Sequence, residues 1–305
     1  MIKMPSAKFS HPRYWPYWLL LLCARIISWL PLRVLWVLGW MIGELTFRVH
    51  GASRRVAIIN LELCFPELPA RERKRLARRH FQAAGLTLLS TGIAWWGSRR
   101  RLQRLVQFKH REYYDQALAQ GKNIILLAPH FLGLEIGGLY LSQERSVVSM
   151  YKKPKNELMD WVLRSRSRYA AIMVERDANP KALIRLIRAQ RPFYYLPDQD
   201  PGHGNHTVFV PFFGVPAATI TALSRIARLG EAIVIPCFTR QLPYGAGYEI
   251  RFHAPMTGFP SGDLAQDARQ MNAEIEKGAH AMPEQYLWTY KRFKTRPERA
   301  RGPYD

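Results

Sequence analysis

Several features that mark common enzyme classes are missing from this chain. Its 305 residues include only three cysteines, which are far apart at Cys23, Cys64 and Cys237. An odd, scattered set of cysteines indicates neither a disulfide framework nor a zinc site, and it fits a reducing compartment. No Gly-x-Ser-x-Gly elbow is present, which disfavours a serine hydrolase of the α/β class. Phosphate-binding loops of the Gly-x-x-x-x-Gly-Lys-Ser/Thr and Gly-x-Gly-x-x-Gly types are also missing, which disfavours nucleotide-driven chemistry.

Acidic residues are scarce as well. The chain has 23 Asp and Glu against 45 Lys and Arg, a formal net charge of +22. Such an excess indicates polyanionic partners, namely nucleic acid, an anionic membrane surface, or acidic proteins and substrates. The hydrophobic content of 48% excludes disorder as the general state of the chain.

The N-terminal region is strongly apolar, yet it lacks an unbroken apolar run of about 20 residues. Arg25, Pro31 and Arg33 interrupt residues 15–47. Tryptophan and tyrosine near the start of this stretch are typical of the headgroup level of a membrane. We predict that residues 1–50 form a helical hydrophobic membrane anchor. A transmembrane helix and a segment lying in the membrane surface both remain open, and a buried hairpin in a soluble protein is the alternative.

A basic helix is expected to follow, over residues 70–91. Leu76, Phe81 and Leu86 form its apolar side. Its other side carries a run of basic residues, which suits an anionic bilayer surface or simply a solvated helix face. These residues are Arg71, Arg73, Lys74, Arg75, Arg78 and Arg79.

Beyond residue 51 the chain is expected to form a single α/β domain over residues 51–305. Apolar runs that alternate with helical patterns favour a central, largely parallel or mixed sheet flanked by helices. The predicted strands are 123–128, 147–151, 193–196, 231–238 and an edge strand at 248–253. The other predicted helices are 53–65, 113–120, 156–168, 181–190, 219–229 and 263–282.

His130 stands where the first predicted strand ends, and Glu135 follows five residues later. Catalytic groups of open α/β sheets gather at the carboxyl ends of strands. An imidazole there can take a proton from an alcohol, and a carboxylate can fix its tautomer and stabilise the imidazolium. This spacing fixes only two residues, so a purely structural histidine is the alternative.

Other polar residues are candidates for binding. The helix predicted at 156–168 carries three arginines, Arg164, Arg166 and Arg168. Each could stabilise an oxyanion or hold a phosphate, or could simply keep the surface soluble. A polar turn also follows the third predicted strand, and it contains the acidic residues Asp198 and Asp200.

A metal site in that turn is disfavoured. His203 and His206 lie close enough in sequence to join the two aspartates around a metal ion. The spacing of these four residues matches no common metal site, so a polar turn is the favoured interpretation.

Several long sequence blocks resemble the late acyltransferases of lipid A biosynthesis, especially the lauroyl type, within the glycerolipid and lysophospholipid acyltransferase superfamily. The His130-x-x-x-x-Glu135 pair resembles the signature of that superfamily. The resemblance covers residues 11–299, nearly the whole chain. The blocks are 11–15, 60–67, 195–200, 208–214 and 283–297.

The resemblance implies transfer of a fatty acyl chain, lauroyl or similar, from acyl carrier protein. The acceptor would be a hydroxyl of a 3-hydroxyacyl chain on the Kdo-modified lipid A precursor. The family acts at the cytoplasmic side of the Gram-negative inner membrane and needs no cofactor, metal or nucleic acid. The resemblance implies catalytic roles for His130 as base, Glu135 as its partner and Arg166 as an assisting residue. Substrate-binding roles are expected for Arg164, Arg168, Asp198 and Asp200.

Two other functions remain open. A glycerol-3-phosphate or lysophosphatidate acyltransferase of phospholipid synthesis would use the same histidine–carboxylate pair on a smaller acceptor. A non-catalytic basic protein that binds membranes or nucleic acid would explain the arginines, but not a proton-transfer pair placed after a strand.

Overall fold

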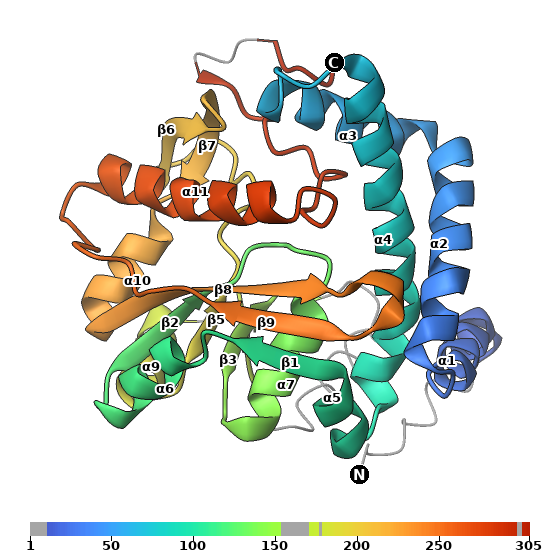
Figure 1. Cartoon of the computed structure of the whole chain (residues 1–305). Helices are drawn as coiled ribbons and strands as arrows, with labels where there is room; N and C mark the ends of the chain where they lie inside the picture. The colour runs from blue at the N-terminus through green and yellow to red at the C-terminus, as the bar shows by residue number, and fades with distance from the viewer. Residues whose placement is uncertain (1–10, 154–170, 177–178, 298–300) are drawn as a thin grey trace.

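A seven-stranded sheet lies at the centre of the computed structural model (Figure 1). The structure describes residues 11–153, 171–176, 179–297 and 301–305, so the helix predicted at 156–168 lies outside the described residues. The strands are β1 (Val106–Lys109), β2 (Asn123–Leu127), β3 (Val148–Tyr151), β4 (Ile172–Glu175), β5 (Phe193–Tyr195), β6 (Thr207–Phe212), β7 (Val215–Ile220), β8 (Ala232–Gln241) and β9 (Tyr248–Phe252).

The sheet has the strand order β1-β9-β8-β2-β5-β3-β4. All neighbouring strands in it are parallel except β8 and β9, which form an antiparallel pair. The prediction of a largely parallel or mixed sheet is therefore confirmed. The prediction that residues 248–253 form an edge strand is wrong. The short strand β1, which the sequence pattern did not indicate, pairs with β9 and takes the edge position.

Helices cover both faces of the sheet. They are α1 (Trp15–Ile27), α2 (Leu32–Val49), α3 (Gly51–Cys64), α4 (Ala70–Trp96), α5 (Arg99–Leu105), α6 (Glu112–Ala119), α7 (Leu134–Glu144), α9 (Pro180–Arg188), α10 (Ala222–Gly230) and α11 (Leu264–Ala281). The predicted helix at 219–229 starts later than expected, at Ala222. Residues 215–220 instead form β7, which makes a separate antiparallel hairpin with β6.

The side chains of β2 explain why this strand is central. Four of its five residues are buried apolar residues, and they alternate between two clusters. Ile125 and Leu127 pack in the cluster that contains α9, α10 and α11 residues. Ile124 and Leu126 pack on the other face with residues of α6 and α7. A strand that is buried on both faces needs a continuous apolar run, because the period of its side chains is two.

Helices α2 and α4 lie side by side in unusually close contact (Figure 1). Gly39 and Gly43 of α2 face Gly85 and Phe81 of α4, so that the two backbones touch. A Cβ atom on Gly43 would overlap the carbonyl oxygen of Phe81. Glu44 supports the same contact, because its carboxylate accepts hydrogen bonds from Arg78 and Gln82 of α4.

Of the two membrane arrangements left open for the N-terminal region, the transmembrane helix is not supported by the described residues. No helix in residues 11–153, 171–176, 179–297 or 301–305 combines the length and the apolarity needed to cross a membrane. The chain bends between α1, which has 13 residues, and α2, which has 18. A span requires about 20 apolar residues.

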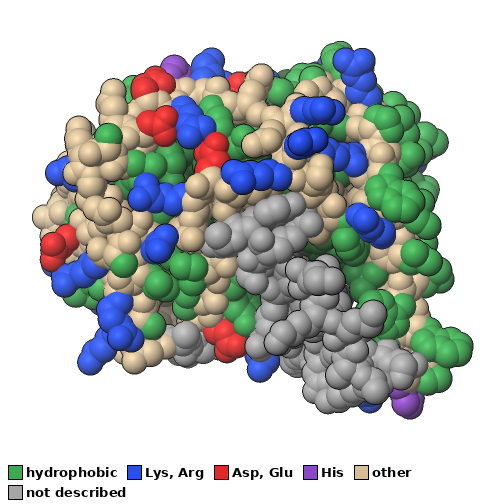
Figure 2. Space-filling view, turned by 90° about the horizontal axis from the view of Figure 1, so that it is seen from below, with side chains coloured by type: hydrophobic (Ala, Val, Ile, Leu, Met, Phe, Trp, Pro, Cys, Tyr) green, Lys and Arg blue, Asp and Glu red, His purple; other side chains and the backbone are tan. Residues whose placement is uncertain are grey.

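Both N-terminal helices nevertheless expose many large apolar side chains to solvent. We call this surface the apolar face. It comprises Trp15, Tyr17, Leu19, Leu20, Leu22 and Ile26 of α1, Trp29 between the helices, and Val34, Val37, Leu38, Trp40, Met41, Ile42, Leu45 and Val49 of α2. Seen from below, hydrophobic side chains gather along the side of the molecule where α1 and α2 lie (Figure 2, right).

Candidate functional site

His130 lies in the turn between the carboxyl end of β2 and the start of α7. The strand ends at Leu127, and Pro129 then disfavours both helix and strand at this point. The imidazole therefore lies at the edge of the sheet where catalytic residues of α/β folds gather, as the sequence predicts.

The residue that meets His130 comes from the neighbouring strand. In the parallel register, Leu127 of β2 is opposite Tyr195 of β5. Both strands continue with an apolar residue and a proline, and His130 and Asp198 each follow three residues after the paired positions. This equal offset places Asp198 beside His130.

Asp198 makes two hydrogen bonds with His130. The imidazole Nδ1 lies 2.6 Å from Oδ1 of Asp198, and the backbone N–H of His130 donates to Oδ2 at 2.9 Å. Only 3% of the Asp198 side chain is exposed, compared with 20% for His130. A buried carboxylate is stable only when it is paired in this way.

The two groups shift each other's pKa in opposite directions. Burial alone would lower the pKa of His130, but the charge of Asp198 and the hydrogen bond outweigh burial and raise it. Burial alone would raise the pKa of Asp198, but the bonds and charge of His130 lower it. Asp198 therefore stays ionised and accepts a hydrogen bond from the Nδ1–H of His130.

With Nδ1 protonated, Nε2 of His130 carries the lone pair that can act as a base. The side-chain amide nitrogen of Gln199 lies 3.3 Å from this Nε2 atom. Gln199 is exposed, so a substrate hydroxyl can take the place of its amide. The arrangement can thus remove a proton from an alcohol and stabilise the resulting imidazolium.

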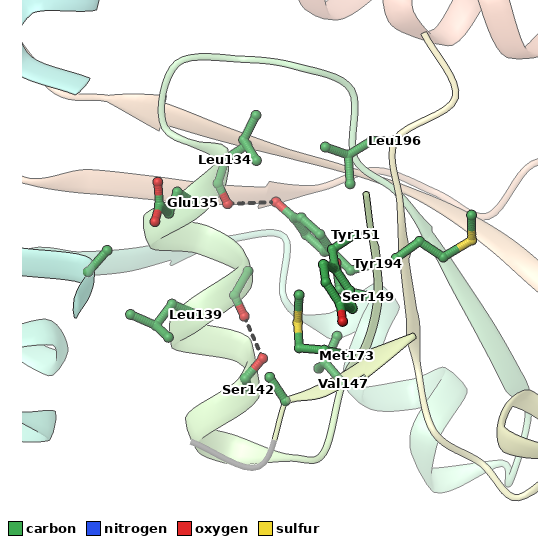
Figure 3. Close-up of a pocket in the computed structure, with 14 residues that line it drawn as sticks. Leu134, Glu135, Leu139, Ser142, Val147, Ser149, Tyr151, Met173, Tyr194 and Leu196 are labelled. Atoms are coloured by element: carbon green, nitrogen blue, oxygen red, sulfur yellow. Dashed lines mark hydrogen bonds between the residues drawn. The ribbon is translucent and has the colours of Figure 1, made fainter. Parts of the chain in front are cut away.

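Glu135 does not hold the position at Nδ1 that the sequence led us to assign to it, because Asp198 occupies that position. Glu135 lies on the first turn of α7 and lines a pocket next to the site (Figure 3). The difference follows from the elements that carry the two carboxylates: α7 places Glu135 along one side of the pocket, whereas the pairing of β2 with β5 brings Asp198 to the ring.

The loop after α11 closes the His130 turn from the other side. The backbone of Phe131 pairs with that of Tyr286, and the N–H of Leu132 donates to the carbonyl of Gln285 at 2.9 Å. Burial and the charge of Asp198 raise the pKa of the Tyr286 hydroxyl, so Tyr286 lies close enough to feel the Asp198 carboxylate. We did not predict Tyr286 as a site residue, although it belongs to the block at 283–297 that carries the family resemblance.

The other predicted site residues lie in different surroundings. Arg164, Arg166 and Arg168 are outside the described residues. The carboxylate of Asp200 accepts backbone N–H groups of Gly202 and Thr295, which fixes the turn to the C-terminal segment. These contacts indicate a structural part for Asp200.

The histidines of the polar turn face other groups. Nδ1 of His206 lies 2.8 Å from the guanidinium of Arg225, and the His203 ring packs near Phe209. In the part of the chain that the structure describes, no group of three or more His, Cys, Asp and Glu residues is arranged to hold a metal ion.

Comparison with known proteins matches the sequence of this chain to one family. The family model for the bacterial lipid A biosynthesis acyltransferases matches residues 2–295. A lipid A biosynthesis lauroyltransferase of Escherichia coli K12 is 35% identical over 295 residues, covering 96% of each chain. A palmitoleoyltransferase of lipid A biosynthesis from the same strain is 34% identical over 96% of this chain and 95% of the relative. A myristoyltransferase from that strain is 30% identical over 97% of this chain and 92% of the relative.

Proposed function

Because the chain belongs to the bacterial lipid A biosynthesis acyltransferases and is therefore an acyltransferase, we propose that it acylates the Kdo-modified lipid A precursor. The donor is a fatty acyl thioester of acyl carrier protein, with a lauroyl or similar chain. The acceptor is the hydroxyl of a 3-hydroxyacyl chain on the precursor. A thioester is already activated, which fits a site built around a base rather than a nucleotide-binding loop.

The observation that supports this proposal is the 2.6 Å contact between His130 and Asp198 at the end of β2. Nε2 of His130 takes the proton as the acceptor oxygen attacks the thioester carbonyl carbon. The tetrahedral intermediate then collapses, the carbon–sulfur bond breaks, and the imidazolium returns the proton to the leaving thiolate. Asp198 keeps the ring oriented and stabilises its positive charge throughout.

Glu135 and Arg166 complete the proposed machinery in supporting roles. Glu135 lies on the first turn of α7, directly after the His130 turn, and lines the same end of the pocket as Leu134 (Figure 3). We propose that its carboxylate orients the bound substrates there. Arg166 is proposed to assist the developing oxyanion, with Arg164 and Arg168 as substrate-binding neighbours.

The surface of the molecule supports a location at the cytoplasmic side of the inner membrane. The apolar face can enter the boundary between headgroups and acyl chains without spanning the bilayer. Basic residues lie between the residues of the apolar face in the sequence. Arg25 and Arg33 lie near the middle of this stretch, and Arg48 lies near its end. The +22 charge favours anionic lipid, the phosphates of the acceptor and an acidic carrier protein.

An acyl-transfer assay with purified protein tests the proposal. Wild-type protein should transfer lauroyl from acyl carrier protein to the lipid A precursor, and His130→Ala should lower kcat by roughly 10²–10⁴, the contribution of a general base. His203→Ala is the matched control, because His203 is an exposed histidine beside the same polar turn; it should retain activity.

The acceptor is tested in the same assay and in cells. Transfer to lysophosphatidate or glycerol 3-phosphate instead of the lipid A precursor would replace the proposal with a role in phospholipid synthesis. Mass spectrometry of lipids from a deletion strain gives the independent result. Lipid A lighter by one acyl chain supports the proposal, and unchanged lipid A with altered phospholipids contradicts it.

A further inference from the structure

A cavity of about 230 Å³ lies between α7 on one side and strands β3, β4 and β5 on the other (Figure 3). Its walls are predominantly apolar, with Leu134, Leu139, Val147, Met173 and Leu196 among the lining residues. An apolar cavity of about 150 Å³ is enough to hold benzene. This cavity therefore has room for a longer hydrocarbon.

Three hydroxyl groups in the wall of the cavity have hydrogen-bond partners within the protein. The hydroxyl of Tyr194 donates to the carbonyl of Leu134 at 3.1 Å, and that of Ser142 donates to the carbonyl of Gly138 at 2.8 Å. The Tyr151 hydroxyl donates to Glu175 at 3.1 Å. Since these hydroxyls have partners in the protein, they place no demand for hydrogen bonds on a ligand.

His130 and Asp198 do not line the cavity themselves, but residues that are close to both in the chain line one end of it. Leu134 is four residues after His130, and Leu196 is two residues before Asp198; both line the cavity (Figure 3). Ser142, Val147 and Met173 lie at the opposite end (Figure 3). A chain attached to a carbonyl carbon beside His130 can therefore enter between Leu134 and Leu196 and run toward Ser142.

Helix α7 provides a scale for the length of that path. Leu134 and Ser142 are eight residues apart on this helix, which corresponds to about 12 Å at 1.5 Å per residue. An extended hydrocarbon with bonds of about 1.5 Å advances about 1.25 Å per carbon. The path from the catalytic end to the deep end thus holds about ten carbons.

We propose that this cavity binds the acyl chain of the donor and that Ser142 and Met173, at its deep end, set the longest chain accepted. The inference rests on the proposed acyl transfer and adds a site and specificity residues to it. The carbons next to the thioester lie at the catalytic pair, so about ten more inside the cavity give a medium-length chain of about twelve. Longer chains meet the deep end and hold the carbonyl carbon away from His130.

Two substitutions of opposite effect test this assignment, with acyl carrier protein loaded with octanoyl, decanoyl, lauroyl, myristoyl or palmitoyl chains. Ser142→Leu adds bulk at the deep end. It should lower kcat/KM for lauroyl by at least about tenfold, the effect of one excess methylene, and should leave kcat/KM for octanoyl within about threefold of the wild-type value.

Met173→Ala lengthens the cavity and should raise kcat/KM for myristoyl by a similar factor.

Each variant has a control on the same element. Gln143→Leu adds the same side chain to α7 at a neighbouring position that does not line the cavity. Ile172→Ala truncates the neighbouring residue of β4, which packs in the core on the other side of the strand. Both controls should keep the wild-type order of preference among the five donors.

The outcomes separate this inference from the proposed function. Transfer that proceeds in all variants with an unchanged preference would overturn the acyl site. A shift that appears equally in Gln143→Leu or Ile172→Ala would overturn it too, because the effect would then be general. Absence of transfer from every donor in the wild-type protein would contradict the proposed function itself.

Discussion

The imidazole of His130 is exposed to two opposing influences on its pKa. Burial disfavours the charged ring, while the Asp198 carboxylate at 2.6 Å favours it, and the carboxylate prevails. A raised pKa makes the ring a stronger base, but it also means that protonation removes the base at a higher pH. His130 and Asp198 titrate as a coupled pair, so the apparent pKa values in a pH profile belong to the pair and not to either residue alone.

Asp198→Asn gives a pH-dependent prediction. In the wild-type protein, kcat/KM should fall as the pH drops through the raised pKa of His130, which lies above the ordinary value of 6.5. Without the carboxylate this pKa decreases, so the acid limb should move to lower pH. At the pH optimum kcat should fall by about 10³–10⁴, because the amide no longer selects the reactive tautomer.

Asp115→Asn is the control for this experiment, since Asp115 of α6 forms an exposed ion pair with Arg111, the residue before that helix. It should leave both the acid limb and kcat unchanged. An acid limb that stays in place in Asp198→Asn would show that Asp198 does not set the pKa of the catalytic base.

At the scale of elements, the contact between α2 and α4 depends on residues without side chains. Gly39 and Gly43 allow the backbone of α2 to touch that of α4 near Gly85. The backbone cannot move aside as a flexible side chain can, so bulk at these positions must separate the helices. Leu32 and Leu35 of α2 belong to the same buried cluster as Leu126 of β2, so the position of α2 is coupled to the core of the sheet.

Gly43→Leu should therefore destabilise the protein by about 2 kcal/mol or more, the upper range for overpacking of a core. Thermal or urea unfolding measures this loss. Gly51→Ala is the control, because a Cβ atom there, at the start of α3, meets only the end of the Arg54 side chain at 3.9 Å. Equal stability of Gly43→Leu and wild type would show that the helices do not need this close contact.

The elements that could be predicted from sequence are those with a strong local pattern. In β2 the buried residues form a continuous apolar run, and in α4 buried residues such as Leu76 and Phe81 recur along one side of the helix. Both patterns lie within a short stretch of sequence, so both elements can be predicted from it. The pairing of His130 with Asp198 could not be derived in this way, because it depends on which strand lies next to β2. The repeated apolar residue–proline pair after β2 and β5 is the one local signal for it.

Exposed apolar side chains are distributed unevenly over the surface of the whole molecule. The apolar face lies at one end, on α1 and α2, while α9 and α10 lie at the other (Figure 1). Exposed apolar area of this extent is rare in a monomer and marks an interaction site. Basic residues beside it add electrostatic attraction to an anionic surface, and salt should weaken only that part of the binding.

Combined Leu20→Ser and Trp29→Ser substitutions should weaken binding to anionic phospholipid vesicles by at least about tenfold, because each large apolar side chain contributes about 1.5–3 kcal/mol when fully buried. Both side chains are 65% exposed, so the fold should remain stable. Co-sedimentation with vesicles at low and high salt measures the binding.

Leu229→Ser serves as the control, since Leu229 is an equally apolar side chain, 56% exposed, on α10. It should not change vesicle binding. A loss of binding in this control, or none in the double variant, would contradict the assignment of the membrane-binding surface to α1 and α2.

The contacts around the His130 turn also have a consequence for the order in which the protein becomes active during synthesis. Phe131 and Leu132 are held by Tyr286 and Gln285, which are added to the growing chain more than 150 residues later. A ribosome-bound chain that already contains His130 and Asp198 still lacks the segment that closes the turn. Because α1 and α2 are synthesised before these residues, the surface proposed to bind the membrane can emerge from the ribosome before the His130 turn is closed.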